Sequence, residues 1–134
     1  MSLGTLIAHA NGVSDGKRIL VVEDDNAIRT MVQRVLRHEG LAVDCASDGF
    51  EAIEKLSRND YGTVVLDLAM PRADGIDVLR YMEREKPQVE RKVIVMTANL
   101  PVLEPLEAKR VAGVLTKPFD IRRLVEQIRD QSAA

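Results

Sequence analysis

The chain has 134 residues and a formal net charge of −2, which is the size of a single domain. Apolar residues make up 46% and charged residues 30%, so disorder over most of the chain is excluded. The balanced charge creates no general basic field, and two Phe, two Tyr and no Trp are too few for a base-stacking platform, so direct binding of nucleic acid is not expected. No apolar run approaches the ~18 residues of a transmembrane helix, so no membrane contact is expected either.

The N-terminal segment differs from the rest of the chain. Residues 1–16 are small and polar, lack the features of a secretory signal, and are expected to form a disordered tail before a domain over residues 17–134. Cys45 is the only cysteine, which excludes an internal disulfide and fits a reducing, cytoplasmic setting. It lies in an apolar run and is expected to be a buried structural thiol. No function is expected for His9 or His38.

Five short runs rich in β-branched residues alternate with longer helical patterns. Several of the runs are almost continuously apolar, which is typical of strands buried on both faces of a parallel sheet. The alternation predicts an open α/β sheet with right-handed crossovers. The expected strands cover residues 18–23, 41–46, 63–68, 92–98 and 113–117.

Caps and stop signals indicate where the helices begin and end. Asp25 is expected to cap the first helix, and Gly40 follows it as a stop. Asp48 and Glu51 form a capping-box-like start for the second helix, and Asp120 is expected to cap the last one. Apolar residues recur at helical spacing in four segments, at Ile28, Val32, Val35 and Leu36, at Ala52, Ile53 and Leu56, at Ile76, Leu79 and Met82, and at Ile121, Leu124, Val125 and Ile128.

Polar residues stand at the carboxyl ends of four expected strands, which is where open α/β sheets bind ligands. These residues are Glu23 and Asp24 after the first strand, Asp67 in the third, Thr97 in the fourth and Lys117 in the fifth. Several buried carboxylates are unfavourable unless a cation lies among them, and an all-oxygen donor set favours Mg²⁺. A lysine and a threonine suit the oxygens of a phosphoryl group, and a carboxylate can accept such a group as an acyl phosphate. The pattern predicts an aspartyl-phosphate site.

Four motifs in residues 18–134 resemble the receiver domain of bacterial two-component response regulators, the CheY-like superfamily. They are ILVVEDD (19–25), VVLDLAMPRADG (64–75), VIVMTA (93–98) and LTKPF (115–119). The resemblance implies a doubly wound, flavodoxin-like sheet of five parallel strands in the order 2-1-3-4-5, with helices on both faces. It also implies a cis bond between Lys117 and Pro118, and a backbone conformation at Gly75 that other residues resist.

The resemblance further implies a role for each site residue. Asp67 would accept a phosphoryl group from a sensor histidine kinase or a histidine phosphotransfer protein. Glu23, Asp24, Asp67 and the backbone carbonyl of Ala69 would hold Mg²⁺, and Thr97 and Lys117 would bind the phosphoryl oxygens.

Two departures from the family pattern affect the expected output surface, residues 98–130. Val114 stands where many members carry an aromatic switch residue, and Pro101 and Pro105 allow only a short, atypical fourth helix starting near Pro105. We therefore expect residues 98–106 to be mobile at rest and to become ordered on phosphorylation, with an output partner or a second copy of the chain docking nearby.

Other functions remain as alternatives. The chain is compatible with a receiver fragment of a longer regulator that has a separate output domain. An aspartyl-phosphate hydrolase would need an Asp two residues after the nucleophile, where this chain has Ala69, so a signalling module that is not an enzyme is preferred. No recognition-helix domain follows residue 130, which disfavours a nucleic-acid-binding protein.

Overall fold

The computed structural model describes residues 18–68, 75–90, 92–97 and 111–133. Five parallel strands in this part form one sheet in the order β2-β1-β3-β4-β5, which confirms the expected topology. Each strand begins and ends within two residues of the apolar run that predicted it. The strands are β1 (Ile19–Val22), β2 (Val43–Ala46), β3 (Thr63–Asp67), β4 (Val93–Thr97) and β5 (Gly113–Thr116).

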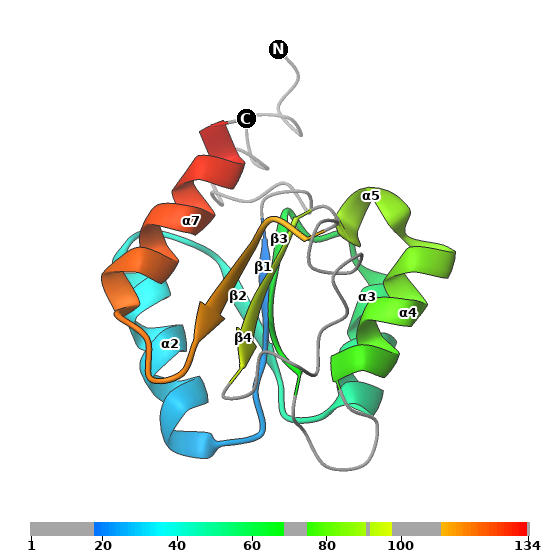
Figure 1. Cartoon of the computed structure of the whole chain (residues 1–134), viewed down its shortest axis with the longest axis horizontal. Helices are drawn as coiled ribbons and strands as arrows, with labels where there is room; N and C mark the ends of the chain where they lie inside the picture. The colour runs from blue at the N-terminus through cyan, green and yellow to red at the C-terminus, as the bar shows by residue number, and fades with distance from the viewer. Residues whose placement is uncertain (1–17, 69–74, 91, 98–110, 134) are drawn as a thin grey trace, which may run out of the picture.

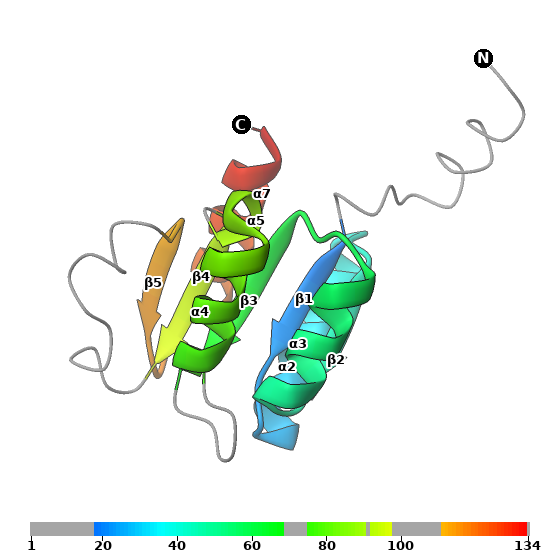
Figure 2. The same ribbon diagram turned by 90° about the vertical axis from the view of Figure 1, so that its right-hand side faces the viewer.

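Helices cover both faces of the sheet, as expected for a doubly wound fold (Figures 1 and 2). Alternate residues of the strands face opposite helix layers. Leu20 and Leu66 lie in the cluster that α3 and α4 cover, whereas Val21 and Val65 lie in the cluster that α2 and α7 cover. Because the central strands are buried on both sides, their sequences are almost continuously apolar. The helices are α2 (Asn26–His38), α3 (Gly49–Arg58), α4 (Gly75–Glu85), α5 (Pro87–Glu90) and α7 (Ile121–Ala133).

The predicted caps of α2 and α7 are present. The Asp25 side chain accepts a hydrogen bond from the backbone N–H of Ile28 at 2.9 Å, and the Asp120 side chain accepts one from the N–H of Arg122 at 2.9 Å. After α2 the chain turns at Gly40, whose φ of 82° is a left-handed conformation that favours glycine.

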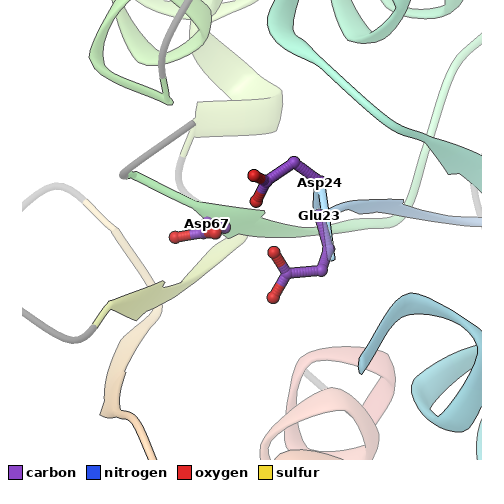
Figure 3. A group of neighbouring side chains, drawn as sticks. All are labelled: Glu23, Asp24 and Asp67. Carbon is purple, nitrogen blue, oxygen red and sulfur yellow. The ribbon is translucent and has the colours of Figure 1, made fainter. Parts of the chain in front are cut away.

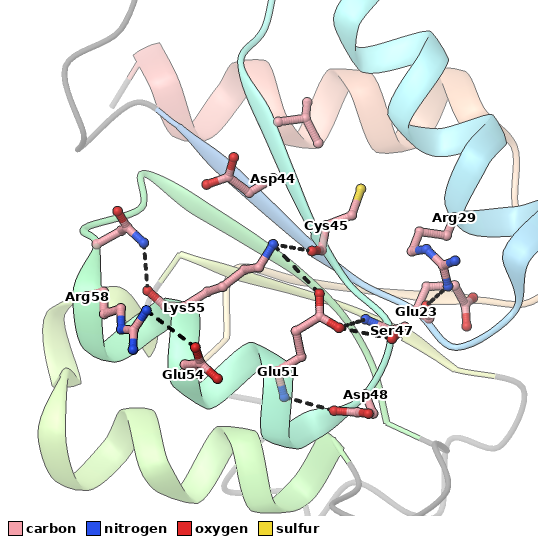
Figure 4. A network of polar contacts seen from close by, with 12 residues as sticks. Glu23, Arg29, Asp44, Cys45, Ser47, Asp48, Glu51, Glu54, Lys55 and Arg58 are labelled. Carbon is pink, nitrogen blue, oxygen red and sulfur yellow. Dashed lines mark hydrogen bonds and ion pairs between the residues drawn. The ribbon is translucent and has the colours of Figure 1, made fainter.

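Polar contacts join β2 to α3 (Figure 4). Asp48 caps α3 by accepting from the N–H of Glu51 at 2.8 Å, while the Glu51 carboxylate accepts from the hydroxyl of Ser47 at 3.0 Å. Lys55 donates from Nζ to the backbone carbonyl of Cys45 at 2.7 Å. Cys45 is half-buried rather than buried as expected, because β2 is an edge strand, and burial raises the pKa of its thiol.

The strand order places a crevice at the carboxyl ends of β1 and β3. The connection after β1 crosses one face of the sheet through α2, and the connection after β3 leads to α4 on the opposite face. The two chain segments part at this point, so polar side chains from the two strand ends meet in the gap between them.

Several expectations fall outside the described residues. They concern the tail over residues 1–16, the backbone carbonyl of Ala69, and the segment 98–106 with the short helix expected near Pro105. Within the described part of the chain, no helix combines the length and the apolar character needed to cross a bilayer.

Candidate functional site

Three carboxylates meet at the crevice between β1 and β3 (Figure 3). Glu23 and Asp24 directly follow β1, and Asp67 is the last residue of β3. One oxygen from each lies within 4.8 Å of the other two. Glu23 and Asp67 are buried and Asp24 is exposed, so the cluster opens to solvent on the Asp24 side.

Lys117 enters the same cluster from the carboxyl end of β5. Its Nζ lies 2.6 Å from Oε1 of Glu23 and 3.1 Å from Oδ2 of Asp67. Its backbone N–H donates to the carbonyl of Thr97 at 2.8 Å, which extends the pairing of β4 with β5 by one residue. This bond fixes the backbone of Lys117, and so the point from which its side chain reaches the carboxylates. The bond to Pro118 is cis, as expected. The structure therefore brings Glu23, Asp24, Asp67 and Lys117 together.

The burial of this cluster changes the protonation of its members. Burial raises the pKa of Glu23 to about 7, assisted by the hydrogen bond with Asp67 and opposed by Lys117. Burial alone would lower the pKa of Lys117, but its hydrogen bonds to Glu23 and Asp67 outweigh this effect and raise it. Lys117 stays charged at neutral pH, whereas Glu23 changes its charge near neutrality.

This shift predicts that the metal-free protein loses stability as pH rises from about 5 to about 8. The folded state holds a proton on Glu23 up to pH near 7, while the unfolded chain releases it near 4.5, so the folded state binds more protons in this window. The expected loss is on the order of 1–3 kcal/mol, measured by urea unfolding in EDTA. Glu23→Gln removes this titration and should flatten the dependence; a Gln variant that keeps the full slope would contradict the assignment.

Thr97 lies beside the cluster at the end of β4. It is fully buried, and it stands one residue beyond Met96, the register partner of Asp67. By strand alternation it belongs with Val93 and Val95 on the face covered by α3 and α4, whereas Lys117 belongs to the other face. The two predicted phosphoryl-binding side chains thus come from opposite faces of the sheet. Val114 is half-buried against the α3 and α4 layer.

Gly75 is required for a reason that the sequence prediction missed. Its φ is not in the left-handed region; among the described glycines only Gly40 has a positive φ. Instead, a Cβ at Gly75 would lie 2.4 Å from the backbone oxygen of Asp67 and 2.4 Å from Cα of Leu68. The first turn of α4 therefore packs directly on the main chain that carries Asp67, and only glycine fits there.

A further residue that sequence reasoning missed is Arg29, in the first turn of α2. Its guanidinium donates from Nη1 to the backbone carbonyl of Glu23 at 2.9 Å and to that of Asp24 at 3.4 Å. One signal was available in the sequence: a positive charge near a helix N-terminus opposes the helix dipole and so needs another reason to be there. The backbone N–H of Asp25 also lies 3.4 Å from Oε2 of Glu23.

The donor set suits a hard divalent cation. Three carboxylates and no nitrogen or sulfur ligand within the described residues of the cluster match the preference of Mg²⁺, which binds a few carboxylates and keeps several waters. A bound cation would also offset the repulsion among three neighbouring carboxylates, which Lys117 alone only partly balances.

Comparison with known proteins identifies the family of this fold and site. The family model for the response regulator receiver domain matches residues 19–129. The chain belongs to this family, as the motifs had suggested.

Individual relatives agree with this assignment. The chain is 38% identical over 119 residues to the response regulator MprA of Mycobacterium leprae, an alignment that covers 84% of this chain and 49% of MprA. It is 31% identical to the response regulator TrrA of Thermotoga maritima, solved in complex with Mg²⁺ and BeF, with a TM-score of 0.76 and coverage of 86% of this chain and 98% of that chain.

A second structure of TrrA contains the histidine kinase ThkA, and there the TM-score is 0.75 with 30% identity, covering 86% of this chain and 97% of that chain. The chain spans about half the length of the curated relatives it matches.

Proposed function

We propose that this chain is a phosphoacceptor switch in which Asp67 receives a phosphoryl group from the phosphohistidine of a sensor histidine kinase or a histidine phosphotransfer protein. The observation that carries the proposal is the buried Asp67 carboxylate, which lies in the carboxylate cluster with Glu23 and Asp24 and 3.1 Å from Nζ of Lys117. A carboxylate in this position faces both a cation site and a fixed positive charge.

The residues divide the chemistry among them. An Asp67 oxygen attacks phosphorus, the bond from phosphorus to the donor nitrogen breaks, and the imidazole leaves with the electron pair of that bond. Lys117 and Thr97 bind the phosphoryl oxygens, Lys117 by charge and Thr97 by its hydroxyl. Glu23, Asp24, Asp67 and the backbone carbonyl of Ala69 would hold Mg²⁺. When bound, the ion neutralises charge on the phosphoryl oxygens during transfer.

The wider setting is also part of this proposal. The kinase-bound structure of TrrA supports a kinase as the donor, and the half-length match to MprA supports a longer regulator with a separate output domain. An output partner, or a second copy of the chain, would dock on residues 98–130, which include most of α7. The domain acts on no substrate besides its own Asp67, works in the cytoplasm, and touches neither nucleic acid nor membrane itself.

Phosphorylation by a small donor tests the proposal directly. Incubation with acetyl phosphate and Mg²⁺ is expected to add one phosphoryl group, measured by intact mass, and EDTA is expected to prevent it. Mg²⁺ is also expected to raise the melting temperature, since it binds only the folded site. Asp24→Asn should raise the Mg²⁺ concentration for half-maximal labelling by roughly tenfold or more.

The same substitution removes one of three neighbouring negative charges, so the metal-free Asp24→Asn protein should be at least as stable as the wild type. Labelling of the wild type that proceeds equally well in EDTA would contradict the metal site. An Asp24→Asn protein that binds Mg²⁺ as tightly as the wild type would exclude Asp24 as a ligand.

A further inference from the structure

The contacts of Arg29 on the loop between β1 and α2 point to a task beyond helix packing. Its guanidinium binds the carbonyl of Glu23 (Figure 4) and the carbonyl of the next residue, Asp24. It also contacts the side-chain oxygen of Asn26. The residues whose carbonyls it holds supply two of the three carboxylates of the acidic site. We propose that Arg29 is a positioning residue that fixes the backbone of this loop so that Glu23 and Asp24 present their carboxylates to a divalent cation.

Three fixed points define the geometry of this short loop. On one side the N–H of Glu23 donates to the carbonyl of Ala46 at 3.0 Å, which continues the pairing of β1 with β2. On the other side Asp25 is anchored as the cap of α2. Between these anchors the guanidinium holds the carbonyls of Glu23 and Asp24 toward α2. With the carbonyls held there, the side chain of Asp24 is left facing Asp67 across the gap (Figure 3).

The position of Arg29 in its helix supports this task. It is the fourth residue of α2, where a positive charge gains nothing from the helix dipole, and α2 has no acidic residue in its first turn to pair with it. Its planar guanidinium binds both carbonyls through Nη1 and the side chain of Asn26 through Nη2, an arrangement that a lysine ammonium on a flexible stem reproduces less well. The hydrogen bonds of Arg29 to the carbonyls of Glu23 and Asp24 explain why an arginine stands at this position.

A positioning role and a purely electrostatic role predict opposite signs for one measurement. A nearby positive charge repels Mg²⁺, so if Arg29 acted only through its charge, removing it would tighten Mg²⁺ binding. If Arg29 positions the ligands, removing it loosens the loop and weakens binding, because partners that orient metal ligands typically contribute 10–100-fold to affinity.

The experiment is Mg²⁺ titration calorimetry on the full chain with Arg29→Gln and Arg29→Lys. Arg29→Gln is expected to raise the dissociation constant roughly tenfold, and Arg29→Lys to raise it by a smaller factor, because lysine keeps the charge but loses the planar guanidinium. In acetyl phosphate labelling, both variants should need more Mg²⁺ for half-maximal rate and reach the wild-type rate at saturation. Arg34→Gln is the matched control, because Arg34 is an exposed arginine on the same helix. It should leave the dissociation constant for Mg²⁺ unchanged.

The inference rests on the proposed metal site, and the outcomes separate the two. Wild-type protein that binds no Mg²⁺ overturns the metal site itself. Wild-type protein that binds while Arg29→Gln binds equally or more tightly overturns the positioning role alone. Circular dichroism and the metal-free melting temperature establish that each variant is folded, and if Arg29→Gln is not, Arg29→Lys decides: binding as tight as that of the wild type overturns the inference.

Discussion

Asp67→Asn is expected to reduce labelling by acetyl phosphate by at least about two orders of magnitude, because an amide oxygen is too weak a nucleophile to replace the carboxylate. The substitution keeps the size of the side chain, so the buried site can stay closed around it. Glu23 is a poor substitute acceptor, since its Oε1 is bound by Lys117 at 2.6 Å and the side chain is fully buried. Asp24 is exposed and lies on the solvent side of the cluster.

The measurement is intact mass after a fixed time with donor and Mg²⁺, followed by peptide mapping of the labelled wild type. The bond formed at Asp67 is an acyl phosphate, so hydroxylamine should remove the label. Asp48→Asn is the matched control: it makes the same chemical change at the cap of α3, where asparagine also caps well, and should be labelled like the wild type. Full labelling of the Asp67→Asn protein would show that another residue accepts the phosphoryl group.

Gly75→Ala is expected to lower the free energy of unfolding by about 2–4 kcal/mol and to slow labelling. The added Cβ would lie 2.4 Å from the backbone oxygen of Asp67 and from Cα of Leu68, and neither is a flexible side chain that can turn away. Either α4 moves outward or the end of β3 shifts. A shift at β3 displaces the acceptor carboxylate, and small misplacements of a reacting group cost much of its rate.

Gly40→Ala is the comparison for this change. Gly40 has a left-handed φ of 82°, and a Cβ there would meet nothing within 4 Å. Alanine should therefore cost about 1–2 kcal/mol through backbone strain, with no effect on labelling. Urea unfolding and labelling rates on both variants separate general destabilisation from displacement of Asp67. A Gly75→Ala protein with wild-type stability and rate would show that the close approach of α4 to β3 is not needed.

The five strands and the helices α2, α3, α4 and α7 could be predicted because their signals are local, whereas the one-turn helix α5 was not predicted. A strand buried on both faces needs an apolar run, and a helix start needs a capping side chain such as Asp25 or Asp120. Most of the site could be predicted for a related reason. The carboxyl ends of parallel strands meet at one edge of the sheet. Residues that follow different strands in the sequence, such as Glu23 and Lys117, therefore become neighbours although 94 positions separate them.

What could not be predicted depends on tertiary contacts that leave no pattern in the sequence. From the sequence, the glycine at position 75 is expected to adopt a special backbone conformation. The structure shows instead that the start of α4 lies against the main chain at the end of β3, and this contact depends on how the helix packs on the strand. The thiol of Cys45 is only half-buried because β2 falls at the edge of the sheet, and an apolar run does not say which strand will be outermost. The sequence predicts that Lys117 binds phosphoryl oxygens, but it gives no sign of the ion pairs that the Lys117 ammonium makes with Glu23 and Asp67 in the structure.

The lysine that bridges α3 to β2 has a consequence for how molecules of this chain behave together. An outermost strand carries a row of main-chain groups that can template pairing with a strand from another molecule, which is a common route to aggregation. Lys55 occupies the outward carbonyl of Cys45 and places an ammonium group, paired with Glu51 at 3.7 Å, along that border. An incoming strand would have to displace this charged group before it could add to the sheet. The β2 border is thereby protected against strand-to-strand polymerisation.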